Sequence, residues 1–304
     1  MNKSPLRTVN SEGMLHGKPR KRSGTHGRGN CARLIFCVGL FALSACSGPG
    51  AAERRVSMGT CQDPSTPAAT AIAACTAVLD DSAAKRAERV KSLFGRAHAR
   101  WRSGDLSGAL ADADALVKLE RMLPAAFALR GQIRGMRGDH AAALRDFDRA
   151  LELHSDVVAY LGDRAVTLAH LGEHERAIED FGRAIEREPG EWRMHGGRCW
   201  SHAVLGKELV GALADCTEAI RLQPTDANLY NSRGFVQFRL GAYAQAVGDY
   251  DHAIALAPQT PSSWFMRGQA KARMDDPSSS QDIEQGLAGE PGIAARYAGY
   301  GIDW

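Results

Sequence analysis

Apolar and polar residues alternate with helical periodicity over most of the chain, roughly from residue 85 to residue 291. Apolar positions return every three or four residues, which is the spacing of one buried face of an α-helix. The periodic stretches come in pairs: a Gly ends the first stretch of most pairs, and Pro189, Pro224 and Pro258 follow second stretches. The pattern therefore predicts pairs of antiparallel helices joined by short turns.

A second pattern repeats with these pairs: an Arg, a small residue directly after it, a turn led by Gly, an Ala and then an Asp. The Arg residues are Arg96, Arg130, Arg164, Arg198, Arg233 and Arg267. The Asp residues are Asp112, Asp146, Asp180, Asp215, Asp249 and Asp282. Successive Arg residues lie 34 or 35 positions apart. A period of that length is typical of arrays of helical hairpins rather than of an enzyme built around one core.

Composition narrows the possible functions further. The net charge is only +3, and much of the basic excess lies in the first 35 residues, so the repeats carry no basic stripe for nucleic acid. The sequence has no Walker loop, no G-x-S-x-G and no dinucleotide fingerprint. Because helical arrays bind partners and rarely catalyse, we expect no enzyme activity, no catalytic residue, no cofactor and no metal.

The repeats resemble the tetratricopeptide repeat over roughly residues 85–291. The second unit carries the resemblance in Phe127, Arg130-Gly131, Gly138-Asp139, Ala143, Phe147 and Ala150. The fifth unit carries it in Tyr230, Arg233-Gly234, Gly241, Tyr243, Ala246, Tyr250, Ala253 and Pro258. The resemblance implies an all-α fold, a right-handed α-solenoid of about six helix-turn-helix units with a cap at each end.

The two ends of the array depart from the repeat and are interpreted as caps. Residues 71–79 parallel residues 212–220 but lack the Asp, so residues 61–84 are expected to form an N-terminal cap containing a degenerate second helix. The sixth unit is one residue short near residues 275–280 and has lost its turn Gly. Residues 292–304 are expected to form a C-terminal cap that covers the last apolar face.

The Arg and Asp of one unit lie 15 to 17 positions apart, at about equal distances from the turn. In antiparallel helices such residues lie at one level, where a bidentate ion pair can form. An alternative is that the Arg residues collect phosphate or carboxylate ligands. Because every Arg has its own Asp, we favour structural ion pairs between helices, within or between units.

The side of each first helix opposite its Arg is the candidate partner-binding groove. Residues two and five positions before or after each Arg lie on that side, at 100° per residue. In the resembled family this side lines a concave groove that binds peptides, and aromatic anchors with a few polar groups suit such recognition. The candidate residues are Phe94, Trp101, Trp200, Asn228, Asn231, Phe235, Phe238 and Phe265. The alternative is that these aromatic side chains only pack between neighbouring first helices.

Four cysteines lie beyond the N-terminal segment: Cys61, Cys75, Cys199 and Cys216. An even number in an exported chain predicts two disulfides, one in the N-terminal cap and one between Cys199 and Cys216. Two His residues near the second pair leave zinc or free thiols as alternatives. We favour the disulfide because these positions face into the hairpin.

The N-terminus has the pattern of an export signal. Basic residues precede an apolar run from Leu34 to Leu43, which is too short to span a bilayer but fits a signal-peptide core. The following Leu43-Ser44-Ala45-Cys46 resembles the bacterial lipobox. The resemblance implies a signal peptide over residues 1–45, lipidation of Cys46 and, with Ser47 next, the periplasmic face of the outer membrane. Ordinary cleavage near Ala45 is the alternative, and residues 46–60 are expected to form a flexible tether.

Together these observations predict an exported, lipid-anchored adaptor of the bacterial cell envelope that holds a protein or peptide partner in its groove. Two alternatives remain open: a structural or self-assembling spacer, and an accessory subunit of an envelope enzyme. The sequence does not fix the partner or the oligomeric state.

Overall fold

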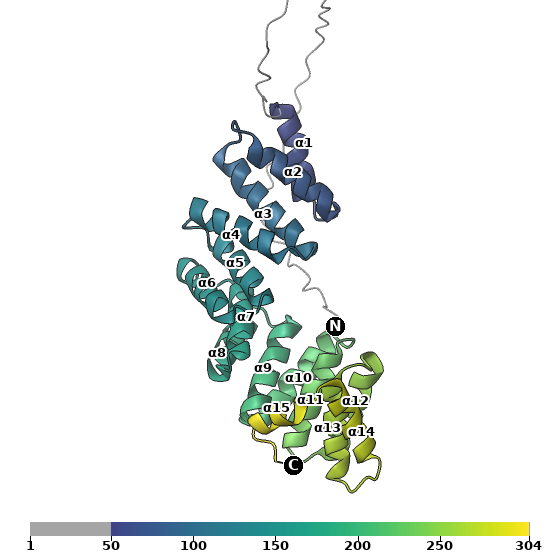
Figure 1. The fold of residues 1–304 in the computed structure, drawn as a ribbon. Coiled ribbons are helices and arrows are strands. Elements are labelled where there is room, and N and C mark those ends of the chain that lie inside the picture. The colour runs from purple at the N-terminus through teal and green to yellow at the C-terminus, as the bar shows by residue number, and fades with distance from the viewer. Residues whose placement is uncertain (1–49, 304) are drawn as a thin grey trace, which may run out of the picture. The chain divides into compact units, whose positions relative to one another are not determined.

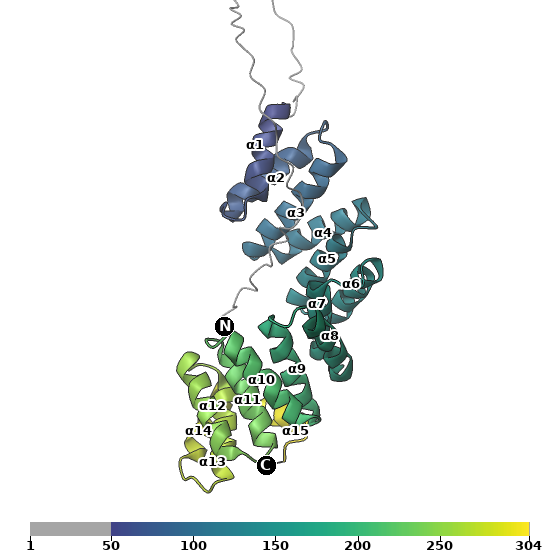
Figure 2. The ribbon, with the colours of Figure 1, turned by 180° about the vertical axis from the view of Figure 1, so that it is seen from behind.

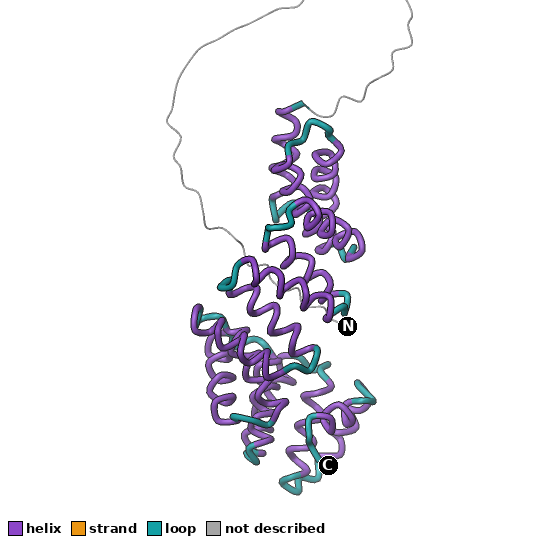
Figure 3. Tube along the Cα trace, turned by 90° about the vertical axis from the view of Figure 1, so that its left-hand side faces the viewer, coloured by secondary structure: helices purple, strands orange, loops and turns teal. Residues whose placement is uncertain are grey.

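The computed structural model describes residues 50–303. The predicted signal peptide, the lipobox and Cys46 lie outside these residues and stay predictions. In the described part all regular secondary structure is α-helical, as Figure 3 shows. The helices are α1 Ala51–Gln62, α2 Ala68–Asp80, α3 Arg86–Arg102, α4 Leu106–Leu119, α5 Pro124–Met136, α6 His140–Leu153, α7 Val158–His170, α8 His174–Arg187, α9 Trp192–Leu205, α10 Leu209–Leu222, α11 Ala227–Arg239, α12 Tyr243–Leu256, α13 Pro261–Ala272, α14 Ser279–Gly289 and α15 Ile293–Gly299.

Helices α3 to α14 form six hairpins that follow one another in chain order, as Figures 1 and 2 show from opposite sides. Each second helix packs against the first helix of the next hairpin. First helices also pack against each other, as α5 does with α7 and α9 does with α11. The structure thus confirms an all-α repeat solenoid with its six units inside residues 85–291.

Glycine in the left-handed region makes most of the turns within hairpins. Gly104, Gly138, Gly172 and Gly241 have φ between 75° and 85°, a region that side chains with a Cβ avoid. In the sixth hairpin, which lost its Gly, Asp275 takes this conformation with φ 57°. Asp tolerates the left-handed region better than most residues, so the turn survives the substitution.

Small residues bring the two helices of a hairpin together. A Cβ on Gly131 would lie 3.0 Å from the ring of Phe147, and one on Gly234 would lie 3.0 Å from the ring of Tyr250. Both rings are buried. The Gly that follows the repeat Arg therefore allows a large aromatic ring from the second helix to fill the core.

The expectation of a flexible tether over residues 46–60 is wrong for residues 51–60. These residues lie in α1, which packs against α2 and α3. Arg54 forms an ion pair with Asp81, and the Ser92 hydroxyl lies 3.1 Å from the Met58 sulfur. Inward-facing residues at positions 54, 58 and 61 give α1 one packed side, so the N-terminal cap begins before Cys61.

Both predicted disulfides are present. Cys61 of α1 is joined to Cys75 of α2, and Cys199 of α9 is joined to Cys216 of α10. All four residues are buried. The first bond joins the two helices of the N-terminal cap, and the second lies inside the fourth hairpin. Cys199 and Cys216 therefore form a disulfide rather than a zinc site or two free thiols.

Candidate partner-binding face

Every repeat Arg pairs with the Asp of its own hairpin. The nearest Arg–Asp contacts are 2.6–2.7 Å in all six units. Most are bidentate: Arg164, for example, donates through two nitrogens to the two carboxylate oxygens of Asp180, at 2.7 and 2.8 Å. The Asp side chains are buried. These contacts confirm the predicted structural ion pairs.

Several of these Arg residues also bind the preceding hairpin. Arg130 contacts Asp114 at 3.0 Å, and Arg164 contacts Asp148 at 2.9 Å. Arg267 contacts Asp251 in the same way, at 2.7 Å. Each of these second carboxylates lies two residues after the Asp of its own unit, so one guanidinium links two helices of its hairpin to the neighbouring one.

The remaining guanidinium surface is occupied by aromatic rings in several units. Arg267 lies over the ring of Trp264, 4.6 Å from its centroid, and Arg233 lies over the ring of Tyr230. Arg130 and Arg267, each engaged by two carboxylates and a ring, have few donors left for a ligand. The alternative in which these arginines collect an anionic ligand therefore has no support from the geometry.

The opposite side of α3, α5, α7, α9, α11 and α13, here called the first-helix face, is where partner contacts were predicted. On α3 it carries Phe94, His98 and Trp101, whose rings stack at centroid distances of 5.7 and 5.9 Å. All three side chains are half-buried. Burial, and secondarily the charge of Arg102, lowers the pKa of His98, so this stack is neutral at pH 7.

On α5 and α7 the same face carries a polar pair. The Gln132 amide in the second hairpin donates to the Asp163 carboxylate in the third hairpin, at 2.8 Å. Burial raises the pKa of Asp163 to about 6, against the opposing effects of Gln132 and Arg193. Sequence reasoning missed Asp163. The signal available was that the corresponding residues in the other units, directly before the repeat Arg, are all uncharged.

The prediction fails for three of the aromatic residues at the C-terminal end. Phe235, Phe238 and Phe265 were expected on an open groove but are 0%, 4% and 1% exposed. They lie on the first-helix face as predicted, yet the chain after α14 covers it: Ile293, Tyr297 and Ile302 join the same buried cluster.

The other candidates at this end are partly accessible. Trp200 is half-buried, with its ring 5.7 Å from Phe235 and 5.9 Å from Tyr300. Asn228 is exposed, while Asn231 is half-buried and contacts Ser262 and Ser263 of the next hairpin. The predicted candidates therefore fall into two groups, Phe94 and Trp101 at one end and those on α9, α11 and α13 at the other.

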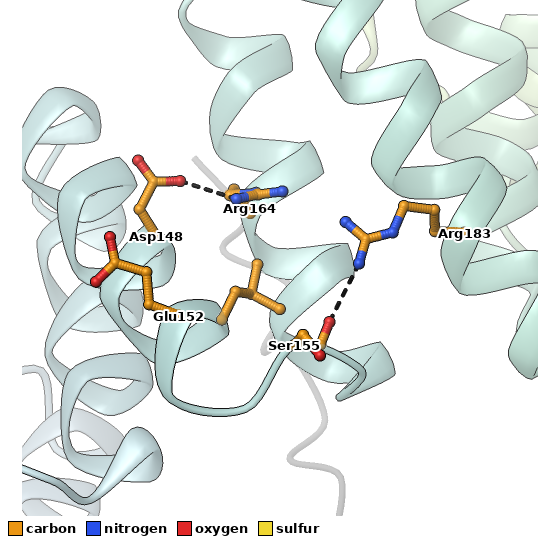
Figure 4. A pocket seen from close by; sticks show the side chains of 6 residues that line it. Asp148, Glu152, Ser155, Arg164 and Arg183 are labelled. Atoms are coloured by element: carbon orange, nitrogen blue, oxygen red, sulfur yellow. Dashed lines mark hydrogen bonds and ion pairs between the residues drawn. The ribbon is translucent and has the colours of Figure 1, made fainter.

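A cavity of about 370 Å³ opens on another side, between α6, α7 and α8 (Figure 4). It is lined by Asp148, Leu151, Glu152, Ser155, Arg164 and Arg183. Arg164 is already paired with Asp148, and Arg183 donates to the Ser155 carbonyl at 3.2 Å. Because its basic groups are used in holding hairpins together, we do not assign a ligand to it.

Residues 50–303 show neither a metal-ligand cluster nor a membrane-spanning helix. Within that range, no three His, Cys, Asp or Glu side chains gather as they would around a metal ion. No helix there is long and apolar enough to cross a membrane.

Known proteins resemble this chain in its repeat sequence and in its fold. A sequence model of the tetratricopeptide repeat family matches residues 129–191 and 172–227. No curated protein matches the sequence. A tetratricopeptide repeat protein from Parabacteroides merdae ATCC 43184 matches with a TM-score of 0.62 and 17% identity, over 79% of this chain and 94% of that one. PilW, a widely conserved type IV pilus biogenesis factor, matches with a TM-score of 0.59 and 14% identity, over 66% and 93%.

Identities this low establish the fold and nothing about partners. The matched residues extend from α5 into α11, in the middle of the array. The same period, turns and Arg–Asp pairs continue through the hairpins on either side. Residues 129–227 thus match the tetratricopeptide repeat model, and the fold of the described residues is that of a tetratricopeptide repeat solenoid.

Proposed function

We propose that this protein is a scaffold that holds an extended or helical segment of a partner protein against the first-helix face of its first three hairpins. The observation that carries the proposal is the half-buried stack of Phe94, His98 and Trp101 on α3. Large aromatic side chains that keep part of their surface in water are the usual anchors of protein interfaces. The repeat fold supports a scaffold role.

Neighbouring residues on the face complement this stack. Val166 is 47% exposed, whereas Ala128 and Gly162 are buried, Gly162 against the Met194 side chain. The Gln132–Asp163 pair adds polar groups that can hydrogen-bond a backbone or pair with a cationic side chain. A partner segment with apolar residues and a nearby Lys or Arg fits this arrangement.

Crosslinking in intact cells tests the proposal. A photoreactive amino acid is placed at position 101 or 132 on the first-helix face, with exposed position 145 on α6 as the matched control. We expect the same protein adduct from positions 101 and 132 and none from position 145. Adducts of equal yield from all three positions, or none from the first-helix face, would contradict the proposal.

The proposed location is the periplasmic face of a bacterial outer membrane, through a lipid on Cys46. Two buried disulfides support an oxidising compartment. Metabolic labelling with a radioactive fatty acid should mark the wild-type chain and leave Cys46→Ser unlabelled. Equal labelling of both chains, or none of either, would exclude this anchor and favour simple secretion.

A further inference from the structure

The last residues of the described chain occupy the first-helix face of the final three hairpins. Helix α15 is followed by residues 300–303, and together they form what we call the C-terminal segment, residues 293–303. In Figures 1 and 2 the yellow α15 lies beside α9 and α11. It also contacts α13 and α14.

We propose that the C-terminal segment is an intramolecular ligand, which closes a second partner-binding surface that accepts an amphipathic helix with aromatic anchors. This inference extends the proposed function to the other end of the same face. The surface, here the C-terminal aromatic surface, consists of Trp200 on α9, Phe235 on α11 and Phe265 on α13.

The segment docks as a bound helical peptide does. Ile293, Tyr297 and Tyr300 follow the spacing i, i+4, i+7, which places them on one side of a helix. The Tyr297 ring meets Phe235 edge-on at 5.2 Å and stacks on Phe265 at 6.0 Å. Tyr297 is 1% exposed, whereas Ala295 and Ala298 on the other side of α15 are exposed.

Aromatic side chains replace the residues of the middle hairpins on the part of the face next to the segment. Two residues after the repeat Arg, the second and third hairpins carry Gln132 and Val166, but the fourth and fifth carry Trp200 and Phe235. An aromatic surface of this size left open to water would favour association. The C-terminal segment covers it in the folded chain.

Two arginines hold the main chain of the segment rather than its side chains. Arg239 of α11 donates to the Tyr300 carbonyl, and also to the Val204 carbonyl at 3.1 Å. Arg273 donates to the Asp303 carbonyl. Because any peptide offers carbonyl groups, these contacts do not depend on this particular sequence.

The segment is a separable element. Helix α15 has seven residues, too few to persist alone in water, so it is helical only while docked. It follows Pro291 and Gly292, which interrupt the helical pattern after α14. The docked segment therefore competes with a partner for this surface, and a partner that must displace it binds with a weaker apparent affinity.

The test uses a fluorescein-labelled peptide of residues 290–303 added to the full chain, with anisotropy as the readout. The variant Tyr297→Ala/Tyr300→Ala weakens the docked segment, and Ala298→Ser on its exposed side is the matched control. We expect the peptide to bind the double variant at least ~10-fold more tightly than the wild-type and control chains, because the competitor in cis is lost. Equal affinity for all three chains would overturn the inference.

A second measurement covers the case in which the double variant unfolds. Hydrogen exchange of the wild-type chain compares amides in residues 293–302 with those in α11. We expect faster exchange in the segment, through local release. Exchange as slow as that of α11 would show that the segment is a fixed part of the core and overturn the inference. Neither readout involves positions 101 or 132, so the two proposals fail separately.

Discussion

Removing one carboxylate from the Arg–Asp series is the sharpest test of what the repeated motif does. Asp180 is 3% exposed and accepts two hydrogen bonds from Arg164, whose side chain is 19% exposed. Breaking a buried ion pair costs about 3–5 kcal/mol, because the remaining charge loses its partner. Arg164 keeps a contact with Asp148 at 2.9 Å, so we expect Asp180→Ala to lower the unfolding free energy by about 2–3 kcal/mol.

The assay is urea denaturation followed by far-UV circular dichroism, with the disulfides intact. The matched control is Arg176→Ala, which removes an ion pair with Glu173 whose two side chains are 51% and 41% exposed. Exposed pairs of this kind are worth about 0.2–1 kcal/mol. The double variant Arg164→Met/Asp180→Leu should recover part of the loss, because it leaves no buried charge at that position.

Two outcomes would refute the reasoning. One is an Asp180→Ala protein whose stability lies within about 0.5 kcal/mol of the wild type, since that is the range of surface substitutions away from such contacts. The other is a double variant that is as unstable as Asp180→Ala. The first result would mean that the Arg–Asp pairs do not hold the hairpins together and would reopen a ligand role for the arginines. The second would mean that the loss of stability does not come from an unpaired buried charge.

Three further predictions concern the interior. The pKa of Asp163 is raised to about 6, above its unfolded value, so the folded state binds the proton more tightly and stability falls as the pH rises from about 4 to 6. Asp163→Asn should reduce that fall in pH-dependent denaturation, and an unchanged slope would contradict it. A Cβ on Gly197 would lie 2.3 Å from the Phe181 ring, so Gly197→Ala should cost at least about 1–3 kcal/mol in the same assay, whereas a neutral effect would refute this packing. Replacing Cys199 and Cys216 by Ser should cost about 3 kcal/mol by freeing the unfolded chain, and an unchanged midpoint would exclude that role.

Much of the fold follows from sequence because its rules are local. The period of the repeat Arg residues, the turn glycines and the matched Asp residues predicted six hairpins and their pairing, and the even number of cysteines predicted both disulfides. Even the sixth turn is understandable, since Asp275 adopts the conformation that Gly has elsewhere. These features depend on residues within one or two hairpins of each other, where spacing along a helix determines position in space.

Features that depend on distant parts of the chain were not predictable in this way. Helical spacing placed Phe235 and Phe265 on the first-helix face correctly, but it carries no information on which segment covers them. Residues 292–304 were expected to cover the last hairpin, whereas Tyr300 reaches Trp200, two hairpins earlier. Similarly, the composition of residues 46–60 indicated a tether, although Arg54 and Met58 have packing partners far along the chain.

The fourth hairpin shows how the array replaces one kind of contact with another. In the second and third hairpins the repeat Arg contacts Asp114 or Asp148 of the preceding hairpin. The corresponding residue before Arg198 is Gly182, which has no carboxylate. The missing contact coincides with two additions inside the hairpin: the Cys199–Cys216 disulfide and His195, which lies 3.1 Å from the Asp215 carboxylate.

The second ring nitrogen of His195 faces the Pro189 carbonyl at 3.0 Å. Both neighbours of the ring are acceptors, so the ring donates to at least one of them. Asp215 lies between Arg198 and His195, as Asp146 lies between Arg130 and Arg134 in the second hairpin. A side chain from the same helix thus gives Asp215 a second partner inside the fourth hairpin, where the link to the preceding hairpin is absent.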